Sequence, residues 1–286
     1  MSDKRAHELL QEAEKKATQK GWFSGPKYEE AGELYEQAAN QFKIAKLMRE
    51  AGDAMMSAAQ MSLKVNERDD AAQRFVTASK SYKKSSPEQA VDALTQAVAL
   101  LTERGRFRMA ASHKMEVARI YEEDLSDVER AMAAYDKAAE WYSDEDSPSL
   151  ANKCLLKVAG FAAQLQNYER AIAIFESIAE ASLDNQLTKW SVKDYFLKAA
   201  LCRLAIPDDI GAAEALERYR ELDPGFDKSR EYKFLDDIIA DVKKGDIQSY
   251  TDHVAGYDQI SQLDKWKTTL LLSIKHSIAQ AEDDLM

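Results

Sequence analysis

The sequence is poor in glycine and proline, which form the turns between β-strands, and it is poor in cysteine. Ten glycines and five prolines among 286 residues are roughly half of average usage, whereas sandwiches and Rossmann-type folds need both residues at many turns. Two cysteines, Cys154 and Cys202, cannot build a disulfide framework and supply too few ligands for a structural zinc. These scarcities favour a helical fold in a reducing compartment.

Long apolar runs and an excess of basic charge are also missing. The longest apolar runs, such as residues 98–101, are far shorter than the ~20 residues of a membrane-spanning helix. The N-terminal segment is charged at almost every turn, so we expect no signal peptide. The net charge of −11 disfavours a nucleic-acid partner. We expect a cytoplasmic protein whose membrane contact, if any, comes from a small surface element.

Helical periodicity, in contrast, runs almost from end to end. Around Ala131 and Ala171, small and apolar residues recur at i, i+3, i+4 and i+7, which is typical of one helix face. Similar segments centre on Ala31, Ala71, Ala90 and Ala212, so hairpins of about 40 residues repeat along the chain. The pattern predicts about fourteen helices in an all-α, right-handed, tetratricopeptide-like solenoid of helical hairpins.

The solenoid is expected to end in a different kind of domain. Residues 1–222 form the predicted helical-repeat sheet, and Asp223-Pro224-Gly225 is typical of a stop and a turn. Residues 223–286 are predicted to form a C-terminal helical bundle, because the last helix carries a wide apolar stripe that must pack on its neighbours.

No catalytic or cofactor-binding motif is visible. The four histidines lie far apart, and the sequence contains no GxxxxGK[ST], GxGxxG or GxSxG. Both cysteines lie in apolar helical segments, which is typical of buried, inert thiols. We therefore expect no enzyme, no metal site and no cofactor.

Two aromatic residues stand where no regular helix face can bury them. Trp22 and Phe23 lie in KGWFSGPK, between Gly21 and Gly25, in the loop near residues 20–27. Such a loop can either touch a bilayer surface weakly, flanked by lysines, or pack the first helix against the array.

Basic residues recur along the predicted array. Lys153 and Lys157 are four residues apart and share one helix face, while Arg106, Lys114 and Lys193 lie on other helices. Together they form either a basic stripe on the concave side, facing an acidic partner, or a scatter of solvated charges.

The chain ends on an acidic segment that closes with apolar residues. Glu282, Asp283 and Asp284 precede Leu285 and Met286. The segment can dock into a basic groove with an adjoining apolar pocket, or it can be a solvated terminus.

The segments GWFSG, AGDAMMSAAQ, ANKCLLKVAGFAA, KDYFLKAALC and EDDLM follow one another in this order. In this combination the chain resembles the soluble NSF attachment proteins of the alpha type over essentially its whole length. The resemblance implies a non-enzymatic adaptor on the cytosolic face of membranes. Such adaptors bind the SNARE complex, a four-helix bundle of syntaxin, SNAP-25 and synaptobrevin type. They recruit and stimulate the hexameric AAA ATPase NSF, which disassembles that bundle in vesicle trafficking and membrane fusion.

The resemblance also implies residue roles. Arg106, Lys153, Lys157 and Lys193 correspond to contacts with the acidic SNARE surface, and Trp22 with Phe23 to a membrane-contact loop. The tail of Glu282, Asp283, Asp284 and Leu285 corresponds to the segment that stimulates the ATPase. Ser112 stands where relatives carry a lysine; Lys114, which we include in the SNARE-binding set, lies about 200° around the helix from it.

The residues alone leave a second function open. A tetratricopeptide-repeat module of the chaperone-binding kind would clamp an acidic C-terminal peptide. Such modules have 34-residue repeats, and the interval of about 40 speaks against this alternative.

Overall fold

The computed structural model describes residues 2–19, 26–206 and 208–283, which form α-helices, two short 3-10 helices and no strand. The helices of these ranges are α1 (Ser2–Thr18), α2 (Tyr28–Ile44), α3 (Met48–Lys64), α4 (Arg68–Tyr82), α5 (Pro87–Glu103), α6 (Phe107–Glu123), α7 (Val128–Asp144), α8 (Pro148–Gln164), α9 (Tyr168–Ser182), α10 (Val192–Ala205), α11 (Asp209–Leu222), α12 (Arg230–Lys244), α13 (Ile247–Ile260) and α14 (Lys265–Asp283). The predicted all-α solenoid of tetratricopeptide-like hairpins, with about fourteen helices, is confirmed.

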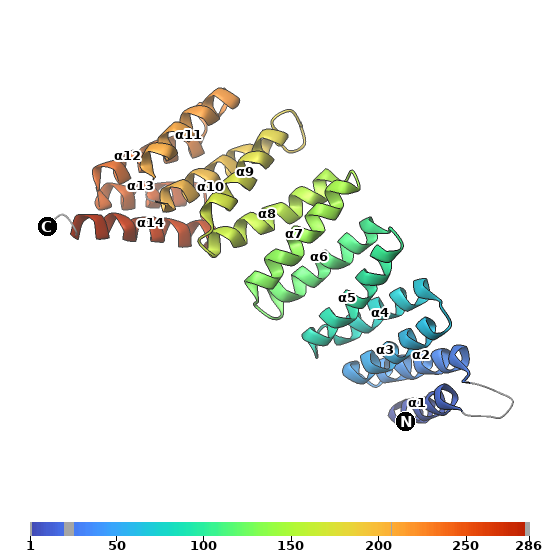
Figure 1. The fold of residues 1–286 in the computed structure, drawn as a ribbon. Coiled ribbons are helices and arrows are strands. Elements are labelled where there is room, and N and C mark those ends of the chain that lie inside the picture. Colours follow the sequence, from blue (N-terminus) through green and yellow to red (C-terminus); the bar gives the residue numbers. More distant parts are fainter. Residues whose placement is uncertain (1, 20–25, 207, 284–286) are drawn as a thin grey trace. The chain divides into compact units, whose positions relative to one another are not determined.

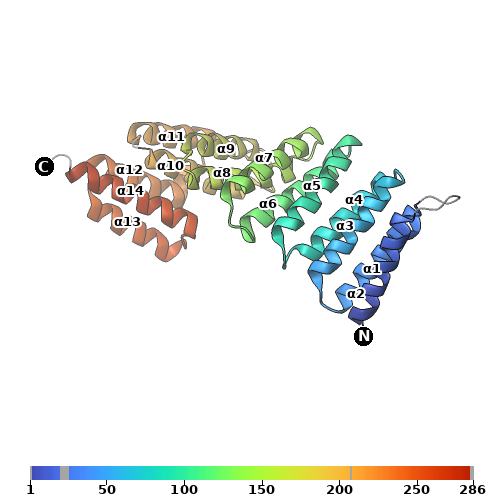
Figure 2. The same ribbon diagram turned by 60° about the horizontal axis from the view of Figure 1, so that its bottom comes forward.

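The chain divides into two compact units, residues 1–154 and 155–286, and the division falls within α8. In the first unit each helix from α1 to α6 packs against the next one in sequence, as far as α7 (Figures 1 and 2). In the second unit α10 contacts α9, α11, α12 and α14, and α13 contacts α12 and α14. The boundary that we expect at residues 222 and 223 lies inside the second unit, between α11 and α12.

A recurrent turn sets the spacing of the helices. After α2, Lys46 adopts a left-handed conformation with φ 61°, and the N–H of Leu47 donates to the carbonyl of Phe42 at 2.9 Å. The same left-handed residue and backward hydrogen bond end α3, α5, α7, α8 and α12, so each helix is closed by a Schellman motif. Of the six left-handed residues that end these helices, only Gly105 and Gly245 are glycines. Because other residue types fill the remaining four positions, the fold needs few glycines.

Small residues hold the helices close together. Ala131, Ala134, Ala138 and Ala139 of α7, which the periodicity predicts on one face, are all buried, and so is Tyr135 beside them. The stripe predicted for the last helix is also buried at Leu270, Leu271, Ile274 and Ile278. Buried apolar surface of this kind stabilises the stack by about 25 cal/mol per Å².

Gly52 of α3 allows one especially close approach. A Cβ built at this position would lie 2.6 Å from Cδ1 and 2.7 Å from Cζ of Tyr82, and would also meet Cε1. The Tyr82 ring is 2% exposed, and its hydroxyl donates to Asp53 at 2.6 Å. The ring therefore cannot move aside without exposing apolar surface and losing this hydrogen bond.

We expect Gly52→Ala to destabilise the first unit by about 1–3 kcal/mol, as overpacking of a core does. Alanine for glycine within a helix would otherwise stabilise it by about 0.5–1 kcal/mol. The matched control is Gly256→Ala in α13, where an added Cβ meets nothing within 4 Å. Urea unfolding followed by circular dichroism measures both changes, and equal stability of the two variants would contradict the close approach.

Candidate partner-binding site

The two lysines of α8 lie on its exposed face. Lys153 and Lys157 are both exposed, whereas Cys154 and Val158, the residues that follow them, are buried. Lys153 makes no ion pair with any residue that the structure describes. Side chains four residues apart on a helix project together, so Lys153 and Lys157 lie next to each other on the exposed face of α8.

Arg106 precedes α6 and pairs with the first turn of α4. Its guanidinium lies 3.2 Å from Asp69, and Arg104 lies 3.0 Å from the same carboxylate. All three side chains are 43% exposed, so these ion pairs are screened by water and contribute little to stability. Two guanidiniums share this one carboxylate, so Asp69 compensates only part of their charge.

Lys114 faces a different neighbour from Ser112. Burial and then the charge of Lys137 in α7 hold the pKa of Lys114 below its ordinary value. Ser112, two residues earlier, lines a cavity shared with α4, and its side chain hydrogen-bonds Tyr142 of α7 rather than lying beside Lys137. The structure therefore separates Lys114 from the position at which relatives are expected to carry a lysine.

Lys193 lies in the first turn of α10, beside an acid that other lysines already neutralise. Asp194 pairs with Lys198 at 2.8 Å and with Lys267 of α14 at 2.6 Å. Burial alone would raise the pKa of Asp194, but these two ammonium groups hold it below its ordinary value. Lys193 is half-exposed and has no ion pair among the described residues, so its charge is available to a partner.

Sequence reasoning missed an exposed apolar pair just before Lys193. Leu187 is 90% exposed and Trp190 is 84% exposed, in the segment that joins α9 to α10 through the short 3-10 helix Lys189–Ser191. A tryptophan so exposed is the kind of residue that anchors protein–protein contacts. The available signal was the loss of helical periodicity across SLDNQLTKWS, which leaves these side chains without a helix face to bury them.

Sequence reasoning also missed a basic cavity of the first unit. About 350 Å³ lies between α4 and α6, where Lys80, Lys83, His113, Glu116 and Arg119 line it. In sequence these residues form two separate helical segments, and only packing brings them together.

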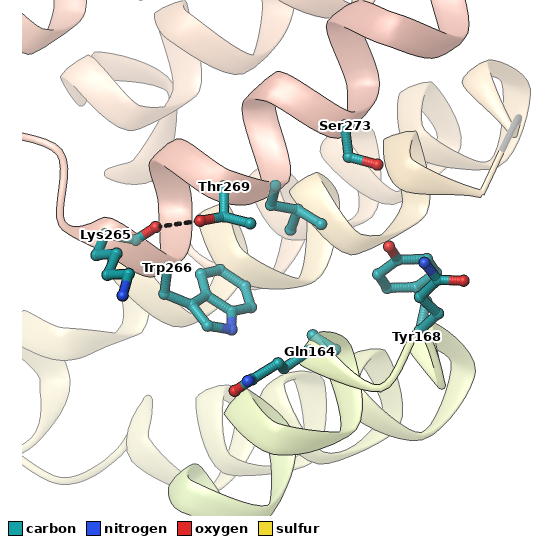
Figure 3. A pocket seen from close by; sticks show the side chains of 9 residues that line it. Gln164, Tyr168, Lys265, Trp266, Thr269 and Ser273 are labelled. Atoms are coloured by element: carbon teal, nitrogen blue, oxygen red, sulfur yellow. Dashed lines mark hydrogen bonds between the residues drawn. The ribbon is translucent and has the colours of Figure 1, made fainter. Parts of the chain in front are cut away.

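The second unit holds a cavity of about 520 Å³ between the α8–α9 turn and α14. Figure 3 shows Lys265, Thr269 and Ser273 on one side and Gln164 with Tyr168 on the other. The Trp266 ring is held in place because its Nε1–H donates to the carbonyl of Gly160 at 3.1 Å. The cavity can take an apolar side chain, but its lining offers no pair of groups arranged for acid–base chemistry.

The remaining predicted binding residues lie within, or directly before, segments that the structure does not describe. Trp22, Phe23, Asp284 and Leu285 fall outside the described residues. Glu282 and Asp283 belong to the last turn of α14.

The titratable groups give no sign of catalysis in the described part of the chain. It contains no group of three His, Cys, Asp or Glu residues placed to hold a metal ion. The two cysteines are buried as predicted, and burial raises the pKa of Cys154 to about 11 and that of Cys202 to about 12. Thiols this basic are poor nucleophiles at neutral pH. Within the same residues, no helix combines the length and hydropathy needed to cross a bilayer.

Comparison with known proteins gives matches along the whole chain. The family model of the soluble NSF attachment protein (SNAP) matches residues 4–279. The probable vesicular-fusion protein sec17 homolog of Schizosaccharomyces pombe is 46% identical over 282 residues, 97% of this chain and 98% of that protein. Alpha-soluble NSF attachment protein of Mus musculus is 46% identical over 283 residues, 97% and 96% of the two chains.

The similarity to solved structures concerns the fold alone. A Pyrococcus horikoshii signal-transduction ATPase with a tetratricopeptide repeat sensor has a TM-score of 0.50 and 17% sequence identity, over 96% of this chain and 42% of that chain. This match supports the tetratricopeptide-like architecture of the helices.

Proposed function

The chain belongs to the soluble NSF attachment protein family, and from this membership we propose that it is the adaptor that couples assembled SNARE complexes to an NSF-type ATPase. The observation that carries the proposal is the family match over residues 4–279, which includes both compact units. Relatives of almost equal length are named as NSF attachment and vesicular-fusion proteins.

The proposed SNARE-binding set consists of basic residues that the fold leaves accessible. Lys153 and Lys157 of α8 are the strongest members because both are exposed on one helix face. Arg106 and Lys193 add charge from other helices, and Lys114 is the weakest member because it is half-buried. Such charges speed and orient association with an acidic helical bundle more than they add affinity.

Leu187 and Trp190 add an apolar component to this proposed interface. Both side chains are almost fully exposed, and Trp190 precedes Lys193 by three residues. An aromatic anchor beside a positive charge suits a partner surface that combines apolar and acidic side chains.

The ATPase contact is proposed for the C-terminal part of the chain, residues 223–286. The tail of Glu282, Asp283, Asp284 and Leu285 offers three carboxylates followed by one apolar side chain. These groups fit a basic surface with an adjoining apolar pocket. Residues 1–222 then hold the SNARE complex, so the two proposed contacts use different parts of the chain.

We also propose a weak peripheral membrane contact through Trp22 and Phe23. Burial of two large apolar side chains contributes about 1.5–3 kcal/mol each, which supports reversible binding only. Trp22→Ser with Phe23→Ser should therefore lower the fraction of protein that floats with liposomes, while SNARE binding in solution stays unchanged. Lys4→Gln, a change in α1 outside this loop, is the control. Equal flotation of wild type and double variant would favour packing of the aromatic pair against the protein.

A binding experiment distinguishes the proposed adaptor function from the alternative of a chaperone-binding module that clamps an acidic peptide. The full chain should sediment with assembled SNARE bundles and bind the individual SNARE segments far more weakly, because an extended helical surface recognises a bundle rather than a peptide. Preferential binding of a short acidic C-terminal peptide would contradict the adaptor and support the chaperone-binding alternative.

A further inference from the structure

The cavity between α4 and α6 combines an apolar lining with polar groups. Val76 of α4, Leu94 of α5 and Met115 of α6 line it together with Ser79 and Ser112. Ser79 is 3% exposed. All of these residues belong to the first unit, and the volume of about 350 Å³ exceeds what a few ordered waters need.

The charges around this cavity do not balance. Lys80, Lys83 and Arg119 bring three permanent positive charges, and Glu116 is the one carboxylate in the lining. Glu116 pairs with Lys83 at 2.7 Å and with Arg119 at 3.0 Å. The two ion pairs share a single negative charge, and Lys80 has no ion pair among the described residues. The lining therefore carries an excess of two positive charges.

His113 adds a titratable donor to the same lining. Burial and then the charge of Lys80 hold the pKa of His113 below its ordinary value, against the opposing effect of Glu116. Lys83 and Arg119 face the same cavity from α4–α5 and α6. A ligand that neutralises these cations would remove the second of these two causes, the charge of Lys80, so binding of an anion and protonation of His113 favour each other.

We propose that the α4–α6 cavity is a binding site for the dianion of a phosphate group. The excess of two positive charges matches a phosphate dianion, whereas one carboxylate would leave a positive charge uncompensated. Lysine, arginine and hydroxyl groups are the usual partners of phosphate oxygens because charge-assisted hydrogen bonds to them are strong. This site is separate from the proposed SNARE-binding set, so it stands or falls independently of the proposed function.

The phosphate group can reach the site on a soluble compound or on a lipid headgroup, and His113 provides a readout for both. With histidine-labelled full chain, NMR at constant ionic strength resolves four imidazole signals, from His7, His113, His253 and His276. Inorganic phosphate and O-phosphoserine should shift the His113 signal saturably and raise its pKa. The other three histidines should not respond.

Vesicles identify the source of the phosphate group. A saturable His113 response to O-phosphoserine, with none to vesicles that contain phosphatidylinositol 4-phosphate, assigns the site to soluble phosphate compounds. The reverse result assigns it to the lipid headgroup. Absence of a saturable His113 response to inorganic phosphate, O-phosphoserine and these vesicles overturns the proposal.

Variants of the charged lining residues test the geometry, because removing a positive charge should weaken phosphate binding and removing the negative charge should tighten it. Lys80→Gln should weaken binding of O-phosphoserine about tenfold, the effect of removing one charged hydrogen bond. Lys84→Gln removes an equal charge from an exposed neighbour outside the lining and should change the affinity little. Glu116→Gln should tighten binding, because Lys83 and Arg119 then lose their competing carboxylate. Equal affinity of the Lys80 and Lys84 variants, or no tightening in the Glu116 variant, would contradict this site.

Discussion

Lys153→Glu combined with Lys157→Glu is expected to abolish detectable binding of assembled SNARE bundles. The pair of changes replaces two positive charges by two negative ones on the exposed face of α8, and like charges across an interface cost several kcal/mol. We expect the affinity to fall by at least about 100-fold, which corresponds to ~2.7 kcal/mol. Both side chains are exposed, so helicity and thermal stability should stay near the wild-type values.

Two controls separate the α8 site from a general charge effect. Lys64→Glu with Lys84→Glu makes an equal change in net charge at exposed positions of the first unit and should reduce binding only slightly. Lys153→Arg with Lys157→Arg keeps the positive charge and should retain most of the affinity. Sedimentation of the four proteins with purified SNARE bundle gives the comparison. Unchanged binding by the glutamate pair would remove α8 from the interface.

Leu285→Ala is expected to remove most of the stimulation of the ATPase while SNARE binding is preserved. The reason is that truncating one apolar anchor at a protein interface costs about 2 kcal/mol or more when that anchor fills a pocket. The remaining acidic residues of the tail can still attract the ATPase, but they cannot position it. ATP hydrolysis by the NSF-type ATPase, measured with SNARE bundle and each variant, tests the role of this residue.

Met286→Ala is the matched control for the tail. It truncates the neighbouring apolar side chain and should have a much smaller effect. A Leu285→Ala protein that stimulates ATP hydrolysis as well as the wild type would show that the ATPase contact lies elsewhere in the chain.

The fold could be predicted from the sequence because its causes are local. Helices such as α3 and α7 each span 17 residues and are followed by a short turn with one left-handed residue, so the apolar pattern repeats about every 20 residues. Alanines such as Ala138 and Ala139 mark the faces where neighbouring helices approach closely. Periodicity records both features, and neither depends on contacts between distant segments.

The surroundings of the candidate site residues could not be predicted in the same way. The pairing of Arg106 with Asp69 joins residues 37 positions apart, and Lys114 meets Lys137 only because α6 packs on α7. The α4–α6 cavity likewise depends on side chains from three helices. Such neighbours follow from packing, which a single sequence read along its length does not contain.

The functional prediction depends on specific segments rather than on composition. Charge and periodicity indicate only a helical repeat protein with scattered basic residues, whereas ANKCLLKVAG and KDYFLKAALC indicate the family. The family match over residues 4–279 confirms that recognition. The roles of Trp22, Phe23 and Leu285 stay predictions, since these residues lie outside the described part of the chain.

Reconstituted SNARE disassembly tests the central claim, that one chain both holds the SNARE bundle and activates the motor. Fluorescently labelled bundle is mixed with the NSF-type ATPase and ATP, and the release of separated SNARE chains is followed over time. We predict rapid disassembly with the wild-type chain, none with Lys153→Glu and Lys157→Glu together, and slow disassembly with Leu285→Ala. Disassembly at the same rate with and without the wild-type chain would contradict the account.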